Sequence, residues 1–341
     1  MPARSLQRSR AGVWRKMDSH DRPDTLFSFI AAYFLAALAL LYLSHSLPRL
    51  LPGDFVTAMY SQSHVALSAE LETSHRASAA AVINQDFLGY LKQFIMLDWG
   101  TSLTYREPVN KLIFSALPWT LLLLGLAHIA SMALGFIAGC EAAWRKGGSF
   151  DRIHVSVMTI MEGIPEIGSG ILLLLVFSLS LGWFPAAGAE TVYGGMEGLE
   201  WLLDVAHHLA LPLLTLILAY LPSNFLLSRA SMLFAINTPY MLTARAKGLS
   251  PLRRRYMHAA RNALIPVATR FAVRLASLLT GAVVVEAIHS YPGIGTLLFN
   301  AIGMRDLPLI TGIVMFSSLA MLSATFALEF VYRALDPRLK K

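Results

Sequence analysis

The sequence has little cysteine and little charge. Cys140 is the one cysteine among 341 residues, which excludes a framework of intrachain disulfides. Charged residues make up 14% of the chain against 55% hydrophobic residues, and the mean hydropathy is +0.56. A soluble globule needs more polar surface than this, so the composition predicts an all-α polytopic membrane protein.

Signatures of catalysis are missing as well. The chain contains no G-x-x-x-x-G-K-[ST], the loop that holds the phosphates of ATP, and no H-E-x-x-H motif. We expect no metal site at His207 and His208. Aromatic residues do not interleave with the basic ones, which argues against nucleic acid as a partner despite the net charge of +7. We therefore expect a non-enzymatic membrane protein with no cofactor of its own.

Six apolar segments are long enough to cross a bilayer core, which needs about 20 helical residues. They cover residues 26–47, 115–143, 153–181, 209–234, 263–288 and 308–332. Four tryptophans near their ends support these boundaries, because indole prefers the headgroup layer; they are Trp119, Trp144, Trp183 and Trp201. The first segment is longer than the core of a signal peptide, and no small-x-small cleavage site follows it, so we expect an uncleaved span.

The distribution of basic residues predicts the orientation. Lys and Arg gather in the leader 1–25, between the second and third segments, in the loop 235–262 and in the tail 335–341, whereas residues 182–207 contain acids and no Lys or Arg. Basic connections stay on the cytoplasmic side, so both termini are predicted to be cytoplasmic and the connection 48–114 extracytoplasmic. Within that connection, apolar residues at helical spacing predict a helix against the outer ends of the spans: Phe87, Leu88, Leu91, Phe94 and Ile95.

The loop 235–262 carries start and stop signals for helices. Seven Lys and Arg and no acid occur between Arg229 and Asn262. Asn237 or Thr238 can cap a helix that begins at Pro239, and Gly248 can end it in a left-handed turn; Ser250 and Pro251 repeat the start signal. The pattern predicts two short helices joined by a glycine elbow. A loop that only sets topology needs charge but no such elbow, so the pattern favours a docking surface.

Two pairs of charges fall inside the apolar segments. Glu162 and Glu166 are four residues apart in the third segment and so are predicted to share one helix face; Pro165 and several glycines beside them predict close helix approach or a local break. Arg270 and Arg274 are four apart in the fifth. Placing a charged side chain at this depth in the membrane costs about 2.5–3.5 kcal/mol on insertion scales. Such a side chain therefore normally faces a partner or a water-filled path. The pairs either form a structural ion-pair cluster, or the acids line a substrate path and favour cationic cargo.

Several short motifs, taken in their order along the chain, resemble those of a known protein family. The stretches are RLLPGD at 49–54, LDWGTSL at 97–103, ALPWTLLL at 116–123, LGWFPAAG at 181–188, TARAKGL at 243–249, HAARNALIP at 258–266, EAIHSYPGIG at 286–295, RDLPLITG at 305–312 and ALDPRL at 334–339. They resemble the binding-protein-dependent ABC importer permeases, in the dipeptide, oligopeptide and nickel branch. The resemblance covers nearly the whole chain after about residue 26.

The resemblance implies partners and roles for particular residues. A permease of this family sits in the bilayer of the bacterial inner membrane with a second similar permease, two cytoplasmic ATPase subunits or domains that bind ATP and Mg, and an extracytoplasmic solute-binding protein. The ATPase-coupling loop would comprise Tyr240, Thr243, Ala244, Arg245, Ala246, Lys247, Gly248 and Leu249. Leu242 stands where the wider family has a glutamate, and Glu166 stands beside the proline where a small or apolar residue is more usual.

One further motif lies at the outer end of the fifth segment. Glu286, Tyr291, Pro292 and Gly293 would form an outer gate or a contact with the binding protein, although a satisfied interfacial acid explains Glu286 equally well. The competing function is an ion-driven secondary carrier, which the intramembrane charges and the broken third segment favour. A carrier has no use for a rigid docking loop, so we expect half of an importer pore, for peptides or for nickel or other metal chelates.

Exchanging two charges tests the ion-pair cluster. If Glu166 and Arg274 form a structural pair, Glu166→Arg and Arg274→Glu should each impair transport, and combining them should restore it, because the attraction survives the exchange. Transport assays on the two single variants and the double variant make the comparison. Restoration would remove the support for acids that line the path.

Overall fold

The structure of the chain is a computed structural model. It describes residues 23–50, 86–192, 194–276 and 282–335, together with the single positions 73 and 77. Almost all of the predicted leader and tail lie outside the described residues, as does most of the long connection up to residue 85. The described part is helical and contains no strand beyond one isolated bridge between Thr101 and Pro108, which confirms the all-α prediction.

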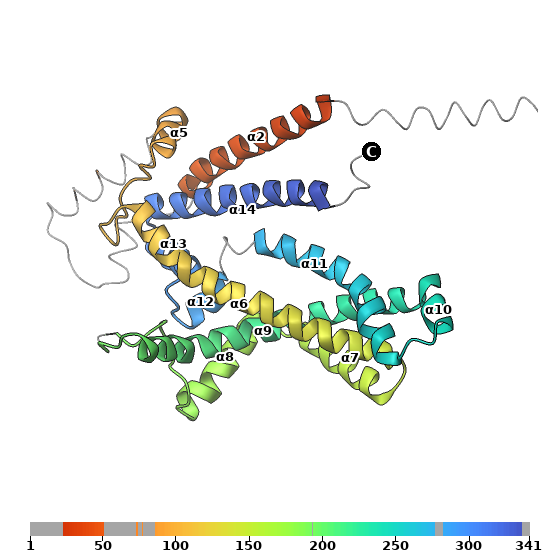
Figure 1. Cartoon of the computed structure of the whole chain (residues 1–341). Helices are drawn as coiled ribbons and strands as arrows, with labels where there is room; N and C mark the ends of the chain where they lie inside the picture. The colour runs from red at the N-terminus through yellow and green to blue at the C-terminus, as the bar shows by residue number, and fades with distance from the viewer. Residues whose placement is uncertain are drawn as a thin grey trace, which may run out of the picture.

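The described helices succeed one another along the chain in the following order. They are α2 (Pro23–Ser46), η1 (Leu47–Leu50), α5 (Phe87–Ile95), α6 (Val109–Trp144), α7 (Ser149–Glu162), α8 (Glu166–Leu173), η2 (Leu174–Ser180), α9 (Leu199–Ile236), α10 (Pro239–Ala246), η3 (Arg253–Ala260), α11 (Arg261–Ala276), α12 (Val283–Ile288), α13 (Ile294–Gly303) and α14 (Leu307–Leu335) (Figure 1).

Three helices among the described residues, α6, α9 and α14, are each long and apolar enough to cross a membrane, and α7 with α8 adds a fourth if the bent pair counts as one span. The first predicted span contains the shorter apolar stretch Ile30–Ser46 of α2. The fifth predicted span includes residues 277–281, which lie outside the described part. The structure thus shows a multi-pass membrane protein, while the full set of six spans stays a prediction.

The third predicted span is broken rather than continuous. Helix α7 ends at Glu162 and α8 begins at Glu166, with a bend of 96° between them. Pro165 has an extended backbone (φ −62°, ψ 142°) and lacks an N–H, so it cannot continue the hydrogen bonds of α7. The local break is confirmed, but the prediction that Glu162 and Glu166 share one helix face is wrong, because they stand on either side of the bend.

Helices α6 and α9 pack backbone against backbone in the middle of the molecule (Figure 1). A methyl group at Gly135 would lie 2.8 Å from Cβ of Asn224, and one at Gly139 would lie 2.7 Å from the backbone O of Phe225. The amide Nδ2 of Asn224 also donates to Oγ of Ser131 at 3.1 Å. Small residues permit this approach, which is the main source of helix association where lipid surrounds the protein.

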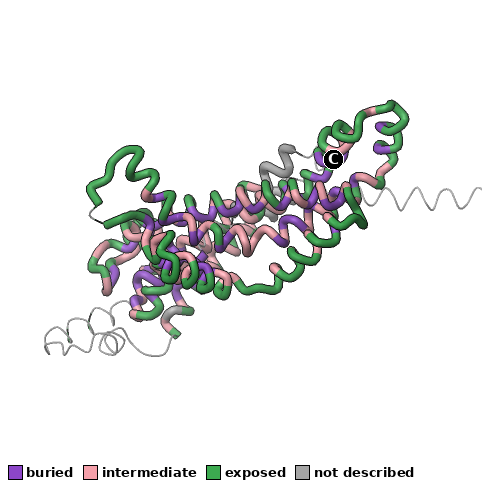
Figure 2. Tube along the Cα trace, turned by 90° about the horizontal axis from the view of Figure 1, so that it is seen from below, coloured by how far each residue is buried: buried purple, intermediate pink, exposed green. Residues whose placement is uncertain are grey.

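Helices α2 and α14 form a second pair, with α5 across one end (Figure 1). Phe87, Leu91 and Phe94 of α5 pack with Leu41 and Met315, whereas Leu88 and Ile95 are exposed. The predicted helix in the long connection is therefore confirmed, with three of its five marker residues facing the spans. Figure 2 shows buried residues recurring along the helices of the middle, while exposed residues dominate the loops at the ends.

The α6–α9 contact predicts a sharp difference between two glycines of one helix. Gly139→Ala should destabilise the protein by about 1–3 kcal/mol, because the added methyl overlaps the backbone of α9. Gly125→Ala is the matched control, since nothing lies within 4 Å of its Cβ position. Melting temperatures of the detergent-purified variants provide the measurement. Equal melting temperatures for the two variants would contradict the packing described above.

Candidate functional site

Helix α10 forms the start of the predicted coupling loop. Thr238 precedes it in an extended conformation (φ −82°, ψ 152°), Pro239 opens it, and Gly248 follows it with φ +68°. The left-handed backbone at Gly248 explains the glycine, because a side chain there would be strained. The hydroxyl of Thr238 donates to the backbone O of Ala235 instead of capping α10, so the predicted start is confirmed without its side-chain cap.

The two faces of α10 have different environments. Met241 and Ala244 are 1% and 5% exposed, and Met241 packs in a cluster with residues of α6, α9, η3 and α11. Ala244 therefore faces the protein interior and is not part of an outer docking surface. The predicted coupling residues on the other face are exposed, with Leu249 half-buried: Tyr240, Thr243, Arg245, Ala246, Lys247 and Gly248. We call these six exposed residues the coupling face.

The second half of the loop differs from the prediction. Oγ of Ser250 accepts a hydrogen bond from N of Arg253 at 3.4 Å, so the second start signal is confirmed. The helix that begins at Pro251 does not stop, however, but passes through the π-helix η3 directly into α11. No glycine or proline interrupts residues 252–265, which explains the continuity. The prediction of a separate second short helix is wrong.

Glu141, near the end of α6, fastens this loop to the spans. Its Oε1 accepts hydrogen bonds from Nη1 of Arg255 and from the hydroxyl of Tyr256, and Oε2 lies 3.4 Å from Nη2 of Arg145. The guanidinium of Arg255 also lies over the ring of Trp144, 5.3 Å from its centroid. The hydrogen bond to Glu141 raises the pKa of Tyr256. The base of the coupling loop is thus held to α6 by charge and by stacking.

A second carboxylate fastens α7 to α9. Asp151 accepts from Nε of Arg229 at 2.6 Å and from Nη2 at 2.9 Å, and the backbone N of Gly147 donates to it at 2.9 Å. The Asp151 side chain is 5% exposed, so this bidentate pair is shielded from water. The turn between α6 and α7 is therefore tied to the same end of α9 that leads into α10.

The intramembrane acids and arginines do not meet in contact ion pairs. Glu162 is exposed and Glu166 half-buried, and no ion pair within 4.0 Å joins either to Arg270 or Arg274 among the described residues. Both arginines turn instead toward Ser223 of α9. The direct ion-pair cluster is not found, because the bend at Pro165 changes the course of the chain between the acids.

In the predicted outer gate, Glu286 is wholly buried and caps a helix. Its carboxyl group accepts from Oγ1 of Thr120 at 2.9 Å, from N of Gly295 at 2.7 Å and from N of Thr296 at 3.3 Å. Thr120 in turn accepts from N of Ile294 at 2.8 Å. The first three N–H groups of α13 are satisfied by side chains of α12 and α6, so Glu286 is a satisfied buried acid.

The glycines of this motif make room for that carboxyl group. A methyl at Gly293 would lie 2.2 Å from Oε2 of Glu286, and one at Gly295 would lie 2.8 Å from it. Tyr291 is also fully buried, whereas Pro292 is exposed and lines a groove of about 560 Å³ with residues of α6 and α13. Of the four predicted gate residues, Pro292 is exposed, and Gly293 also lines the groove.

Asp306 repeats this arrangement at the start of α14. It is fully buried, accepts from Oγ of Ser102 at 2.6 Å and from N of Thr104 at 2.9 Å, and caps the helix through N of Leu309 at 3.3 Å. Two of the motifs in the sequence, at 97–103 and 305–312, therefore meet in space. Each buried acid holds a loop of distant sequence against the start of a helix.

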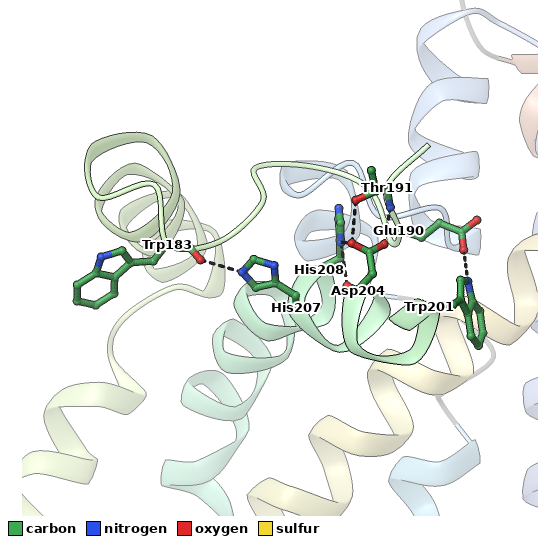
Figure 3. A network of polar contacts seen from close by, with 7 residues as sticks. All are labelled: Trp183, Glu190, Thr191, Trp201, Asp204, His207 and His208. Carbon is green, nitrogen blue, oxygen red and sulfur yellow. Dashed lines mark hydrogen bonds and ion pairs between the residues drawn. The ribbon is translucent and has the colours of Figure 1, made fainter. Parts of the chain in front are cut away.

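The acidic outer connection is organised by its own side chains (Figure 3). Asp204 accepts from N and Oγ1 of Thr191 at 2.6 and 2.7 Å, and Nε1 of Trp201 donates to Glu190 at 2.6 Å. The ring of His207 contacts the backbone O of Trp183 at 2.8 Å. These hydrogen bonds hold residues 183–192 over the start of α9, which begins ten residues earlier than predicted.

Sequence patterns did not identify Glu141 and Asp151 as anchors. Each is an acid close to the end of an apolar segment and faces a basic stretch that is otherwise free of acids, which is the signal that could have found them. Their partners, Arg255 and Arg229, are more than 70 residues away, so no local spacing reveals the pairing.

Removal of Glu286 tests its capping role. Glu286→Ala should destabilise the protein by about 1–3 kcal/mol, because it leaves the buried N–H groups of Gly295 and Thr296 without an acceptor. Glu197, an exposed acid of the outer connection, provides the control variant Glu197→Ala. Thermal unfolding in detergent compares the two. Equal melting temperatures would refute the structural role.

Comparisons with known proteins agree with this architecture. Residues 131–341 match the model of the binding-protein-dependent transport system inner membrane component. The chain is 35% identical to the di/tripeptide transport system permease protein DppB of Pseudomonas aeruginosa, with 87% of this chain and 93% of that protein covered. It is 31% identical to the oligopeptide transport system permease protein AppB of Bacillus subtilis (89% and 95% covered). It is 32% identical to the glutathione transport system permease protein GsiC of Pectobacterium atrosepticum (86% and 90% covered). The chain therefore belongs to the family of binding-protein-dependent transport system inner membrane components.

Proposed function

We propose that this chain is a permease subunit of an ATP-driven importer and forms half of its pore. The observation that carries the proposal is the coupling face, a rigid exposed surface on a helix whose other face is built into the spans. The other half of the pore would be a second, similar permease. An extracytoplasmic solute-binding protein would deliver the cargo, and the site of this assembly would be a bacterial inner membrane.

The energy for transport must come from another polypeptide. This chain has no phosphate-binding loop, so ATP and Mg would bind to two cytoplasmic ATPase subunits or domains. In this proposal the coupling face docks on one of them, and ATP binding draws the two docked loops together. Because α10 is packed on α6 and α9, its displacement tilts these spans and changes which side of the membrane the pore opens to. Hydrolysis and product release would reset the pore.

Peptides are the proposed cargo. The three relatives compared above are named for di- and tripeptides, for oligopeptides and for glutathione, itself a tripeptide. None of these three names mentions nickel, so we favour peptides over metal chelates. Capture by the solute-binding protein would set much of the selectivity.

The docking role of the coupling face is tested at Gly248. A Cβ at this position would meet none of the described atoms within 4 Å, so Gly248→Asp adds a charge to the coupling face without a steric clash at Cβ. We expect recovery of the ATPase with the tagged chain from mild detergent to fall about tenfold, equivalent to about 1.4 kcal/mol of binding. Peptide uptake should fall with it.

Gly195→Asp is the matched control. Gly195 also has a left-handed backbone (φ +59°) with open space around it, but it lies in the outer connection. Its variant should keep both the ATPase and the uptake. Wild-type chain that purifies without an ATPase or a second permease, even after cross-linking, would overturn the proposal and favour an ion-driven carrier. Normal uptake by Gly248→Asp at normal expression would contradict the coupling role.

A further inference from the structure

The outer side of η3 and of the start of α11 combines cations with large apolar side chains. Arg253, Met257, Arg261 and Ile265 follow one another at intervals of four residues, so they lie on one side of this continuous helix. All four are exposed, Met257 by 64% and Ile265 by 65%. We call these four residues the basic face.

The opposite side of the same helix is buried. Ala259, Ala260 and Ala263 are at most 4% exposed and share a cluster with residues of α6, α9 and α10. These contacts fix the rotation of the helix about its own axis, so the basic face cannot turn inward. It must meet whatever lies outside the described part of this subunit.

Contacts with the end of α6 place the basic face near the surface of the membrane. Helix α6 is long and apolar enough to cross a bilayer, and its last residue is Trp144, whose indole prefers the headgroup layer. The guanidinium of Arg255 lies over the Trp144 ring, 5.3 Å from its centroid. Arg253 is two residues from this contact, and Arg261 directly precedes the fifth predicted span. The two ends of η3 are therefore close to the level of the lipid headgroups.

The two arginines of the basic face have no acid as a partner among the described residues. Neither Arg253 nor Arg261 takes part in an ion pair there. Residues 237–262 contain no acid, and Glu141 and Asp151, at the same end of the molecule, already bind other arginines. The leader and the tail contain more Lys and Arg than acids. The counter-charge of the basic face therefore comes from outside the chain.

The apolar members of the basic face favour lipid over a soluble partner. Beyond Ile265, the outer side of α11 continues with Val273, which is 57% exposed. Arginines that alternate with apolar side chains at the end of a span are typical of a helix at the membrane boundary, where the stems contact acyl chains and the charged heads reach the phosphates. The coupling face differs, because its six residues include no large aliphatic side chain.

We propose that the basic face binds the headgroup of an anionic phospholipid, with the acyl chains against Met257 and Ile265. The planar N–H groups of a guanidinium match the oxygens of a phosphate and can bind two of them at once. A zwitterionic lipid brings a cation of its own with its phosphate, whereas an anionic lipid neutralises the arginines. The proposal goes beyond the import function and does not depend on it, because only this surface and its membrane location enter the argument.

Lipid titration of the full-length chain tests the proposal. Native mass spectrometry in a neutral detergent compares the affinities for dioleoylphosphatidylglycerol and dioleoylphosphatidylcholine. We expect the double variant Arg253→Gln, Arg261→Gln to bind phosphatidylglycerol about tenfold more weakly, because each arginine contributes to the attraction of an anionic headgroup. Its affinity for phosphatidylcholine and its melting temperature in lipid-free detergent should be retained. Arg253→Lys, Arg261→Lys keeps the charge and should keep more of the affinity.

A second pair of exposed basic residues provides the matched control. The double variant Lys92→Gln, Arg106→Gln removes the same amount of charge from the predicted outer side of the molecule. Its affinity for phosphatidylglycerol should equal that of the wild-type chain. The comparison separates binding at the basic face from a general effect of net charge.

A second measurement locates the lipid. In vesicles of equal parts phosphatidylglycerol and phosphatidylcholine, p-benzoylphenylalanine in place of Met257 should cross-link radiolabelled phosphatidylglycerol more than radiolabelled phosphatidylcholine. The same group in place of Tyr240, an exposed residue of the coupling face, should show no such preference. This measurement leaves both arginines in place, so it does not depend on how their substitution affects folding.

Several outcomes would overturn the inference. Equal affinities of the wild-type chain and the Gln variant of the basic face for phosphatidylglycerol would do so, as would an equal loss in the control variant. Cross-linking without preference for phosphatidylglycerol at position 257 would also do so. If the Gln variant keeps its lipid affinity but no longer purifies with an ATPase or a second permease, the basic face docks a protein instead. None of these results bears on the import function, which is tested separately at Gly248.

Discussion

The close contact between α6 and α9 is the constraint on which the rest of the structure depends. Lipid is as apolar as a leucine side chain, so burial of apolar surface does little to join two spans, and close packing must do so instead. Gly135 and Gly139 let the two backbones approach each other closely over about one helical turn. Helices α7, α8, α10 and α11 then pack on this pair, and the coupling face takes its position from it.

Three buried acids and the half-buried Glu141 hold the two ends of the molecule in place. At the outer end, Glu286 and Asp306 cap α13 and α14 and bind segments that are distant in the sequence. At the other end, Glu141 and Asp151 hold the coupling loop and α7 to the spans. A helix start with unsatisfied N–H groups is costly inside a membrane protein, so a carboxyl group that satisfies them also fixes the loop that carries it. The glycines beside Glu286 are needed because a side chain there would keep the carboxyl group from reaching the start of the helix.

Much of the fold could be predicted because its signals are local. The length of the apolar segments predicted the long helices, and a proline beside glycines predicted the break before Glu166. The motif around Gly248 predicted a turn that the backbone shows. The features that the sequence did not predict are of another kind. The inward face of Ala244, the continuity of η3 with α11 and the partners of Glu141 depend on contacts across the molecule. Spacing within one segment cannot reveal which of several acids an arginine on another helix will meet.

The way α10 is embedded has a mechanical consequence. Its buried Met241 shares one cluster with residues of both α6 and α9, and α9 has 38 residues, a rod of about 57 Å at 1.5 Å per residue. A force applied to the coupling face is therefore delivered near one end of two stiff rods rather than to a hinge of its own. Such rods would turn as levers, so a small displacement at the end that carries α10 would become a movement of comparable size at the far side of the α6–α9 contact. The glycines of that contact would then act as the fulcrum.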